Sequence, residues 1–266
     1  MDNDGKMSIS EFSKWSGITR RNLIFYDKQG VLKPELRGEN NYRYYSYYQL
    51  GVAWALSLLR EIGLPLSEIR TFLDNRSPEE MIRFYGHQIR RLASEQQRLG
   101  QIMTMMQARI DVTAQGLGVD ETEIRLELLP EEELVMSDEP GPDDTAVDMI
   151  RDLFRRHRGI VTGVPSGFFY SRERLLRRDW HRPGRYYYRT PHSGDKRPEG
   201  LYAVGHIRCG FREPFPLFER LTDYIEKENL IITGDAYEDY IFNEMAIASA
   251  ENYLIRIAIR VERSAP

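Results

Sequence analysis

Apolar residues recur at intervals of three over the first 25 positions and predict two short amphipathic helices joined by a tight turn. The first helix is expected to begin at Ser8, and the turn comprises Gly17–Thr19. Thr19 is expected to cap the second helix by accepting a backbone N–H. The second helix ends at Gly30–Pro34, and Asn40–Ser46 is expected to form a hairpin. The apolar positions are Ile9, Phe12, Trp15, Ile18 and Leu23.

A seven-residue repeat then predicts a long helix from Pro78 to Gly118. Nine of its eleven seam positions are apolar or aromatic, no proline interrupts it, and Ser77 supplies an N-cap. A repeat of 3.5 residues needs a helical partner, so we expect a coiled coil between two copies of the chain. Packing of the stripe within its own chain is the alternative. The seam positions are Ile82, Tyr85, Ile89, Leu92, Gln96, Leu99, Met103, Met106, Ile110, Thr113 and Leu117.

From Thr122 onward the pattern changes to alternating segments with two amphipathic helices among them. The order strand, helix, strands occurs twice. This order predicts an antiparallel C-terminal domain made of a duplicated strand-helix-strand-strand unit that encloses a cleft, and the chain as a whole is predicted to be α+β. The expected strands are Ile124–Leu128, Leu201–Cys209, Thr233–Phe242 and Tyr253–Val261, and the expected helices are Asp143–His157 and Phe215–Ile225.

The second N-terminal helix opens with side chains suited to DNA. Its first three residues, Arg20–Asn22, occupy the part of a recognition helix that faces the major groove, where Arg pairs with guanine edges and Asn with adenine edges. Phe25 and Tyr26 follow, and a tyrosine hydroxyl there can reach a phosphate. In the hairpin, Arg43 and Tyr44 are expected to project to the DNA as a wing. Taken singly, each residue is as well explained by solvation or packing, and only the ordered set predicts DNA binding.

The charge distribution agrees with this prediction although the net charge of the chain is −4. Between Lys6 and Arg76 there are 11 Lys or Arg and 7 Asp or Glu, whereas between Val119 and Ile150 one Arg accompanies 12 acidic residues. DNA affinity depends on the local basic patch rather than the total. The single cysteine, Cys209, excludes an intramolecular disulfide and argues against a thiolate metal site, so no cofactor is expected.

The segment Ile9–Leu73 resembles the DNA-binding domain of the MerR family of bacterial transcription regulators. The matching pieces are Ile9–Phe12, Gly17–Thr19, Leu23–Asp27, Gly30–Pro34, Tyr42–Tyr45 and Leu59–Ile69. The family usually has Arg-Tyr where this chain has Ile24-Phe25, which removes two family phosphate contacts, and Arg60 matches a family phosphate-binding position. The resemblance implies a DNA-binding set of Thr19, Arg20, Arg21, Asn22, Phe25, Tyr26, Arg43, Tyr44 and Arg60.

The resemblance also implies a mode of action. A homodimer, joined by an antiparallel coiled coil through residues 78–118, would bind a palindrome between promoter elements that are spaced too far apart. Ligand binding would then distort the DNA so that RNA polymerase holoenzyme engages both elements.

The C-terminal half resembles the GyrI-like effector-binding domain of multidrug-responsive MerR members. The match is carried by Glu238-Asp239-Tyr240-Ile241, in which the family's glutamate meets a cationic ligand. The residues themselves agree, because aromatic faces and a carboxylate attract cations, and Glu238 and Tyr240 share one face of a strand. Ordinary sheet core is the alternative for each ring. The predicted ligand-binding residues are Glu238, Tyr240, Tyr170, Trp180, Tyr187 and Phe168.

Seven arginines between Arg172 and Arg189 surround Trp180 without an assigned role. They could form a solvated face, bind an anionic ligand, pair with the acidic run at 131–133, or contact DNA or polymerase.

Taken together, these features predict three domains: a winged helix-turn-helix (1–77), a dimerisation helix (78–118) and an effector-binding domain (119–266). We expect a homodimeric activator, cytoplasmic and associated with the bacterial nucleoid, that is not an enzyme. Its partners would be promoter DNA, RNA polymerase and a small hydrophobic, cationic or amphiphilic effector, and no membrane. A small-molecule hydrolase, as some GyrI-like domains are, and a ligand-independent DNA-bending regulator are the alternatives.

Overall fold

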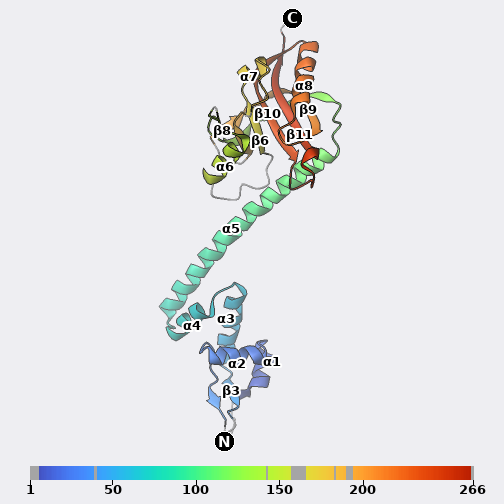
Figure 1. Ribbon diagram of the computed structural model, residues 1–266. Coiled ribbons are helices and arrows are strands. Elements are labelled where there is room, and N and C mark those ends of the chain that lie inside the picture. The colour runs from blue at the N-terminus through green and yellow to red at the C-terminus, as the bar shows by residue number, and fades with distance from the viewer. Residues whose placement is uncertain are drawn as a thin grey trace. The chain divides into compact units, whose positions relative to one another are not determined.

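The computed structural model describes residues 6–38, 41–141, 143–156, 166–182, 184–189 and 194–264. The chain forms two compact units, residues 1–96 and 97–266, and the dividing point lies inside the long helix α5, Pro78–Leu117 (Figure 1). Each unit therefore contains one end of that helix. The division at residues 77 and 118 treats the helix as a separate part and stays a prediction.

The first unit packs helices around a small antiparallel sheet with strand order β1-β3-β2. Strands β2 and β3 form a wing, but its first strand, Leu36–Arg37, lies before the predicted hairpin Asn40–Ser46. Asn40, which we assigned to the turn, lies outside the described residues. The stacked rings of Phe12 and Tyr45, with centroids 4.5 Å apart, join the helices to the sheet. The elements before α5 are β1 Lys6–Ser8, α1 Ile9–Ser16, α2 Arg20–Lys28, β2 Leu36–Arg37, β3 Arg43–Ser46, α3 Gln49–Glu61 and α4 Leu66–Asp74.

Helix α1 begins where the sequence predicted, but its buried face differs from our expectation. Trp15, assigned to the core, is 67% exposed. The buried positions are Ile9, Phe12 and Ser16, which are spaced by three and then four residues. Because an α-helix has 3.6 residues per turn, a strict spacing of three drifts off the buried stripe by the second turn, and Trp15 lies outside it.

Helix α5 runs unbroken from Pro78 to Leu117 and ends directly before Gly118, as predicted. The Ser77 hydroxyl accepts a hydrogen bond from the Glu80 backbone N–H at 3.0 Å and caps the first turn. In the described part of the chain most of the seam is uncovered, so packing within the same chain does not bury it. The exposed seam positions are Ile82, Ile89, Leu92, Leu99, Met103, Met106, Ile110 and Leu117.

The second unit is built on an eight-stranded antiparallel sheet of order β4-β9-β11-β10-β6-β7-β5-β8. The successions β5-α6-β6-β7 and β9-α8-β10-β11 repeat the predicted order of strand, helix and two strands. The first repeat, however, begins with β5 and not with the expected strand Ile124–Leu128, which is part of β4 and pairs with β9. Its elements are β4 Ile124–Leu129, β5 Glu132–Met136, α6 Ala146–Arg156, β6 Ser166–Tyr170, α7 Arg172–Leu176, β7 Tyr186–Arg189, β8 Asp195–Arg197, β9 Gly200–Cys209, α8 Phe215–Lys227, β10 Leu230–Phe242, the 3-10 turn Ala250–Asn252 and β11 Tyr253–Arg263.

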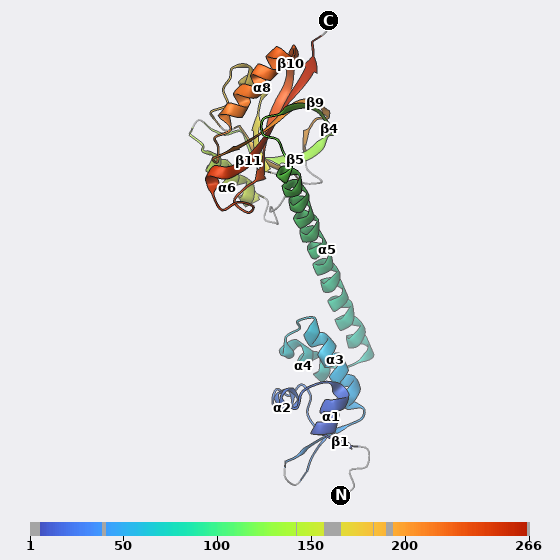
Figure 2. The same ribbon diagram turned by 90° about the vertical axis from the view of Figure 1, so that its right-hand side faces the viewer.

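Helix α8 lies along strands β9, β10 and β11 and covers one face of this sheet (Figure 2). That face carries the larger core, to which Leu153 of α6, Phe218 of α8 and Ile257 of β11 belong. The opposite face carries a smaller cluster that includes Tyr187, Tyr202 and Tyr237. No helix among the described residues is apolar enough over a sufficient length to span a membrane.

Candidate functional site

The first turn of α2 presents the predicted recognition residues to solvent. Thr19 Oγ1 accepts the Asn22 backbone N–H at 3.2 Å, which confirms the cap, and Arg20, Arg21 and Asn22 are all exposed. Phe25, on the next turn, is 45% exposed. A positively charged, solvated helix start of this kind can enter a major groove without rearrangement.

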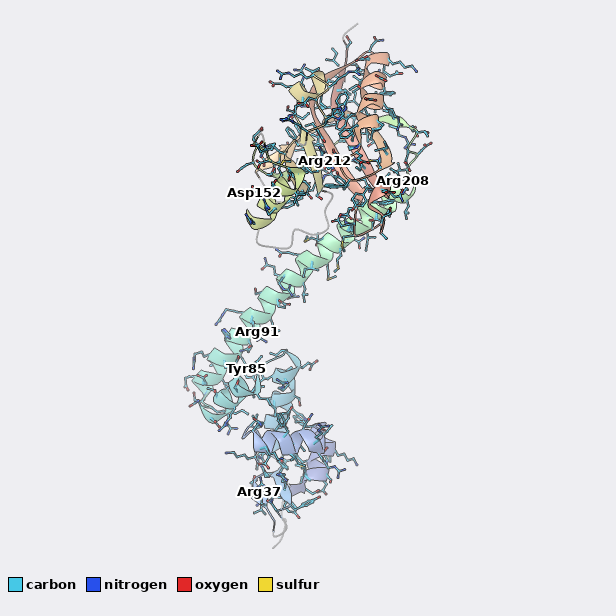
Figure 3. The ribbon with its side chains drawn as sticks, in the orientation of Figure 1. Arg37, Tyr85, Arg91, Asp152, Arg208 and Arg212 are labelled. Atoms are coloured by element: carbon cyan, nitrogen blue, oxygen red, sulfur yellow. The ribbon has the colours of Figure 1, made fainter. Side chains whose placement is uncertain are left out.

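The wing is fixed to this helix by a carboxylate that the sequence analysis did not single out. Asp27 is buried, and its Oδ2 accepts hydrogen bonds from Arg43 Nε at 2.7 Å and Arg37 Nη2 at 2.5 Å. Figure 3 labels Arg37 in this region. Arg43 therefore positions the wing, and its contact with Asp27 competes with the predicted contact to DNA. The paired Asp27 and Arg43 lie 16 residues apart in the sequence, and only the folded wing brings them together.

The other predicted DNA-contacting residues lie in the same unit. Tyr26 and Tyr44 are partly buried, and the Tyr44 ring packs against Tyr42 with centroids 5.4 Å apart. Arg60 is exposed near the end of α3, and its Nη1 donates to the Leu64 carbonyl oxygen at 2.7 Å. This bond fixes the guanidinium beside the turn between α3 and α4.

In the second unit, strand β10 turns Glu238 toward the face that α8 covers. The side chain is fully buried, and Oε2 accepts the Tyr170 hydroxyl at 2.7 Å. Oε1 is also buried and makes no direct hydrogen bond among the described residues, although the Tyr240 hydroxyl lies near enough to stabilise the charged carboxylate. Strand β6 approaches very closely here, since a Cβ at Gly167 would lie 1.5 Å from the Glu238 carbonyl oxygen. Only glycine fits at that position.

Aromatic rings surround this carboxylate. Phe168 and Tyr240 lie on the same face, with ring centroids 6.3 Å apart, and Tyr170 packs edge-on against Phe218 at 4.8 Å. Trp180 stacks on the Phe218 ring at 5.6 Å, one layer further from the carboxylate. The structure thus gathers five of the six predicted ligand-binding residues into one core.

Tyr187 is the sixth predicted residue, and the structure separates it from the others. Its hydroxyl donates to Asp239 Oδ1 at 2.6 Å on the opposite face of the sheet. The reason is the alternation of side chains along a strand, which places Tyr186 and Tyr188 on the Glu238 side and Tyr187 on the far side. Aromatic composition alone carries no information about this register.

An arginine that the sequence analysis did not identify joins the carboxylate. Arg212 follows β9, and its Nη1 lies 2.6 Å from the Tyr170 hydroxyl oxygen and 3.3 Å from Glu238 Oε2 (labelled in Figure 3). Burial raises the pKa of Glu238, while Arg212 and the Tyr170 hydroxyl oppose the rise. Nothing in the sequence pattern connects positions 212 and 238, which only the fold brings together.

Asp239, the next residue, lies in the opposite electrostatic setting. Its Oδ2 contacts Arg189 Nη2 at 2.7 Å and Arg256 Nη2 at 3.1 Å. Burial disfavours the charged form, but these two guanidinium groups and the Tyr187 hydroxyl outweigh it and hold the pKa of Asp239 below its usual range. Asp239 therefore favours its charged form and anchors the neighbouring strands through Arg189 and Arg256.

The arginines around Trp180 are partly explained by this network. Arg189 Nε lies 2.9 Å from Glu132 Oε2, so one member pairs with the acidic run at 131–133. Arg185 Nε donates to the Ser137 carbonyl oxygen at 2.7 Å, and Arg178 contacts Glu226 at 3.1 Å. These contacts link neighbouring elements of the domain.

Two other side chains of this unit, Cys209 and His206, have pKa values that disfavour their reactive or charged forms. Burial and nearby carboxylates raise the pKa of the Cys209 thiol to about 12, and burial together with Arg256 lowers the pKa of His206 to about 4. No group of three His, Cys, Asp or Glu residues within the described ranges could hold a metal ion.

Comparison with known proteins finds a family match in the first unit and relatives that span both units. Residues 7–76 match the profile described as MerR HTH family regulatory protein. The chain is 30% identical over 264 residues to the multidrug-efflux transporter 2 regulator of Bacillus subtilis, covering 96% of each chain. It is 25% identical over 280 residues to the multidrug-efflux transporter 1 regulator of the same organism, covering 96% of this chain and 97% of that one.

Among solved structures, the chain matches EcmrR in a cryo-EM EcmrR–DNA complex with 19% identity and a TM-score of 0.40. That match covers 97% of this chain and 100% of the other.

Proposed function

Since the chain belongs to the MerR family of helix-turn-helix regulatory proteins, we propose that it acts as a homodimeric, effector-responsive activator at a palindromic promoter element. Family membership makes it a DNA-binding transcription regulator. The homodimer, the effector and the contact with RNA polymerase holoenzyme are parts of the proposal. So is the division of labour among residues 1–77, 78–118 and 119–266.

The DNA contact is proposed for the exposed start of α2 and the adjoining wing. Arg20, Arg21 and Asn22 are exposed and preceded by a capped turn, so their placement costs no refolding on binding. The ion pairs of Asp27 with Arg37 and Arg43 hold the wing beside the helix. Phosphate contacts from this patch would set the register, and base contacts would select the sequence.

The effector is proposed to be a small hydrophobic cation. The observation that carries this proposal is a fully buried carboxylate, Glu238, with aromatic rings around it and one oxygen that makes no direct hydrogen bond within the described residues. Such a group attracts a cation that brings its own apolar surface. The two Bacillus relatives are named as regulators of multidrug-efflux transporters, which agrees with ligands of this kind.

Activation is proposed to follow from a shift in population. A ligand shifts a conformational equilibrium only by its difference in affinity for the two states. The effector-bound dimer would bind kinked, untwisted promoter DNA better than relaxed DNA, which offsets the cost of deformation. RNA polymerase would then engage both promoter elements.

We further propose that the protein is cytoplasmic, needs no cofactor and is not an enzyme. The Glu238 carboxylate lies beside Arg212, and the Cys209 thiol has a pKa of about 12, so neither is prepared to attack a substrate. Turnover of an ester by the pure protein would favour the hydrolase alternative instead.

The test is transcription in vitro from a promoter that the protein binds, with purified holoenzyme and tetraphenylphosphonium as the probe cation. We expect the probe to raise transcript yield and to unwind a closed circular template. Glu238→Gln should still bind the DNA but lose the response, whereas Glu228→Gln, at an exposed position after α8, should keep it. Unchanged yield and unchanged DNA winding with the wild-type protein would contradict the proposal.

A further inference from the structure

The site around Glu238 already holds a cation supplied by the protein. Arg212 lies in the turn between β9 and α8, and its Nη1 donates to the Tyr170 hydroxyl oxygen at 2.6 Å and lies 3.3 Å from Glu238 Oε2. Its backbone N–H donates to the Tyr240 hydroxyl oxygen at 3.3 Å. Arg212 thus contacts the same carboxylate and hydroxyls that a bound cation would contact.

The aromatic part of the site is occupied by the same side chain. The guanidinium carbon of Arg212 lies 4.4 Å from the centroid of the Phe168 ring and 6.0 Å from that of Tyr170. Cation–π attraction operates at these distances. A ligand cation would need these same ring faces, so the ligand and the guanidinium compete for one place.

The ion pair between Arg212 and Glu238 is weaker than a guanidinium and a carboxylate can make it. A guanidinium can give a carboxylate two parallel hydrogen bonds, but here one nitrogen makes one long contact of 3.3 Å. Glu238 Oε1 makes no direct hydrogen bond among the described residues, and Arg212 does not reach it. Arg212 also has a φ of 66°, a backbone conformation that costs energy in a residue other than glycine. A better partner could therefore replace Arg212.

Phe211 accompanies Arg212 and adds an apolar surface to this internal cation. Its ring is 41% exposed, and its centroid lies 5.4 Å from that of Tyr240 and 6.5 Å from that of Phe168. Since the ring and the guanidinium come from adjacent residues of one partly exposed turn, they can leave the site together. The pair has the chemistry of a lipophilic cation, which is an aromatic body next to a positive charge.

We propose that Arg212, together with Phe211, is an internal occupant of the effector site that a lipophilic cation must displace before its own charge reaches Glu238. This inference rests on the proposed function. It makes Arg212 a specificity-determining residue, because an effector must compete with a tethered guanidinium. Cations that bind Glu238 less strongly than Arg212 does would be excluded. Only cations with enough apolar surface to replace Phe211 as well would bind.

The experiment compares binding of tetraphenylphosphonium to full-length variants by equilibrium dialysis. Arg212→Gln should lower Kd at least about tenfold, the scale of one charge-assisted hydrogen bond. Adding Glu238→Gln to this variant should abolish the gain. The matched control is Arg208→Gln on β9, since Arg208 pairs with Glu121 outside the site and should leave Kd unchanged.

A second measurement keeps the test valid if Arg212→Gln folds poorly. In the wild-type protein, displacement of Arg212 breaks its backbone hydrogen bond to Tyr240, so tetraphenylphosphonium should speed hydrogen exchange at residues 210–213. Slower exchange there on binding would overturn the proposal.

The remaining outcomes separate this inference from the proposed function. Cation binding that needs Glu238 but is not strengthened by Arg212→Gln would overturn displacement and leave the proposed effector class standing. Absence of cation binding in the wild type and in Arg212→Gln alike would overturn both. Binding that appears only in Arg212→Gln would support displacement.

Discussion

Glu238 and Asp239 are adjacent in the sequence, but strand β10 turns their carboxylates to opposite faces with different surroundings. Asp239 has two arginines within 3.1 Å of one oxygen, whereas Glu238 has one at 3.3 Å and is otherwise among aromatic rings. The pKa of Asp239 is lowered and that of Glu238 is raised. The first carboxylate is a structural anchor, and the second is the proposed contact of the effector.

This contrast predicts that two matched substitutions change the stability by different amounts. Asp239→Asn leaves Arg189 and Arg256 without a buried counter-charge and should lower the free energy of unfolding by about 3–5 kcal/mol. Glu238→Gln removes a charge that burial already disfavours and should change it by less than about 1 kcal/mol. Thermal unfolding of the full-length variants provides the comparison. Equal losses in the two variants would contradict the assignment of roles.

Cation binding should depend on pH through Glu238. Its raised folded-state pKa means that its contribution to stability is present below the usual glutamate pKa of 4.5 and is lost as pH rises through the raised value. A cation needs the charged form, so affinity should fall as pH is lowered through that same value, above 4.5.

The titratable groups near Glu238 have pKa values outside the pH range in which Glu238 is expected to titrate. His206 has a pKa of about 4, that of Asp239 is lowered, and burial raises the pKa values of Tyr170 and Tyr240. Tetraphenylphosphonium affinity measured between about pH 5 and pH 8 checks this. The same slope in Glu238→Gln would assign it to another group.

At the scale of elements, the last turn of α5 packs so closely against strand β10 that no side chain larger than that of glycine fits at position 116. A Cβ at Gly116 would lie 2.7 Å from Ile241 Cγ2 and 2.7 Å from Phe242 Cε1. Ile241 and Phe242 follow Glu238 and Tyr240 on the same strand. Gly116 therefore lets the end of the long helix contact the strand that carries the proposed effector site.

Gly116→Ala should accordingly destabilise the second unit by about 1–3 kcal/mol through overpacking, despite the better helix propensity of alanine. A Cβ at Gly100 on the same helix would meet no heavy atom of the described residues within 4 Å. Gly100→Ala should therefore stabilise the second unit by about 1 kcal/mol through the helix propensity of alanine. Unfolding of both variants by heat gives the comparison. Equal gains would show that the helix end is not held against β10.

The sequence predicted those features whose causes are local. The Thr19 cap, the start of α5 at Ser77 and the shared face of Glu238 and Tyr240 follow from one residue and its near neighbours, and all are confirmed. The duplicated C-terminal unit followed from the order of alternating and helical segments. Trp15 was misplaced because a spacing of three only approximates a helix.

Features that depend on contacts distant in sequence could not be predicted. Arg212 meets Glu238 across 26 residues, and Asp27 meets Arg43 across 16, with no pattern that links either pair. Tyr187 was grouped with Glu238 by composition, but strand register placed it beside Asp239. The fold class could be inferred from periodicity, whereas the electrostatics of the site required the structure.

At the scale of the whole molecule, the uncovered seam of α5 predicts association. Leu99 is 47% exposed and lies near the middle of the repeat, so in an antiparallel coiled coil the two copies of this residue approach each other. Leu99→Glu would bring two carboxylates together in the proposed dimer and should leave the protein monomeric. Gln101→Glu, exposed and off the seam, should not. Analytical ultracentrifugation distinguishes the two, and a dimeric Leu99→Glu would refute association through this seam.

The central claim is that the exposed start of α2 directs this protein to a promoter. It is tested most directly by binding the full-length protein to sheared genomic DNA and sequencing the recovered fragments, with an Arg20→Ala, Arg21→Ala variant in parallel. We predict enrichment of a palindrome between promoter elements spaced further apart than usual, and loss of that enrichment in the variant. Recovery of the same unselected fragments by both proteins would contradict the account.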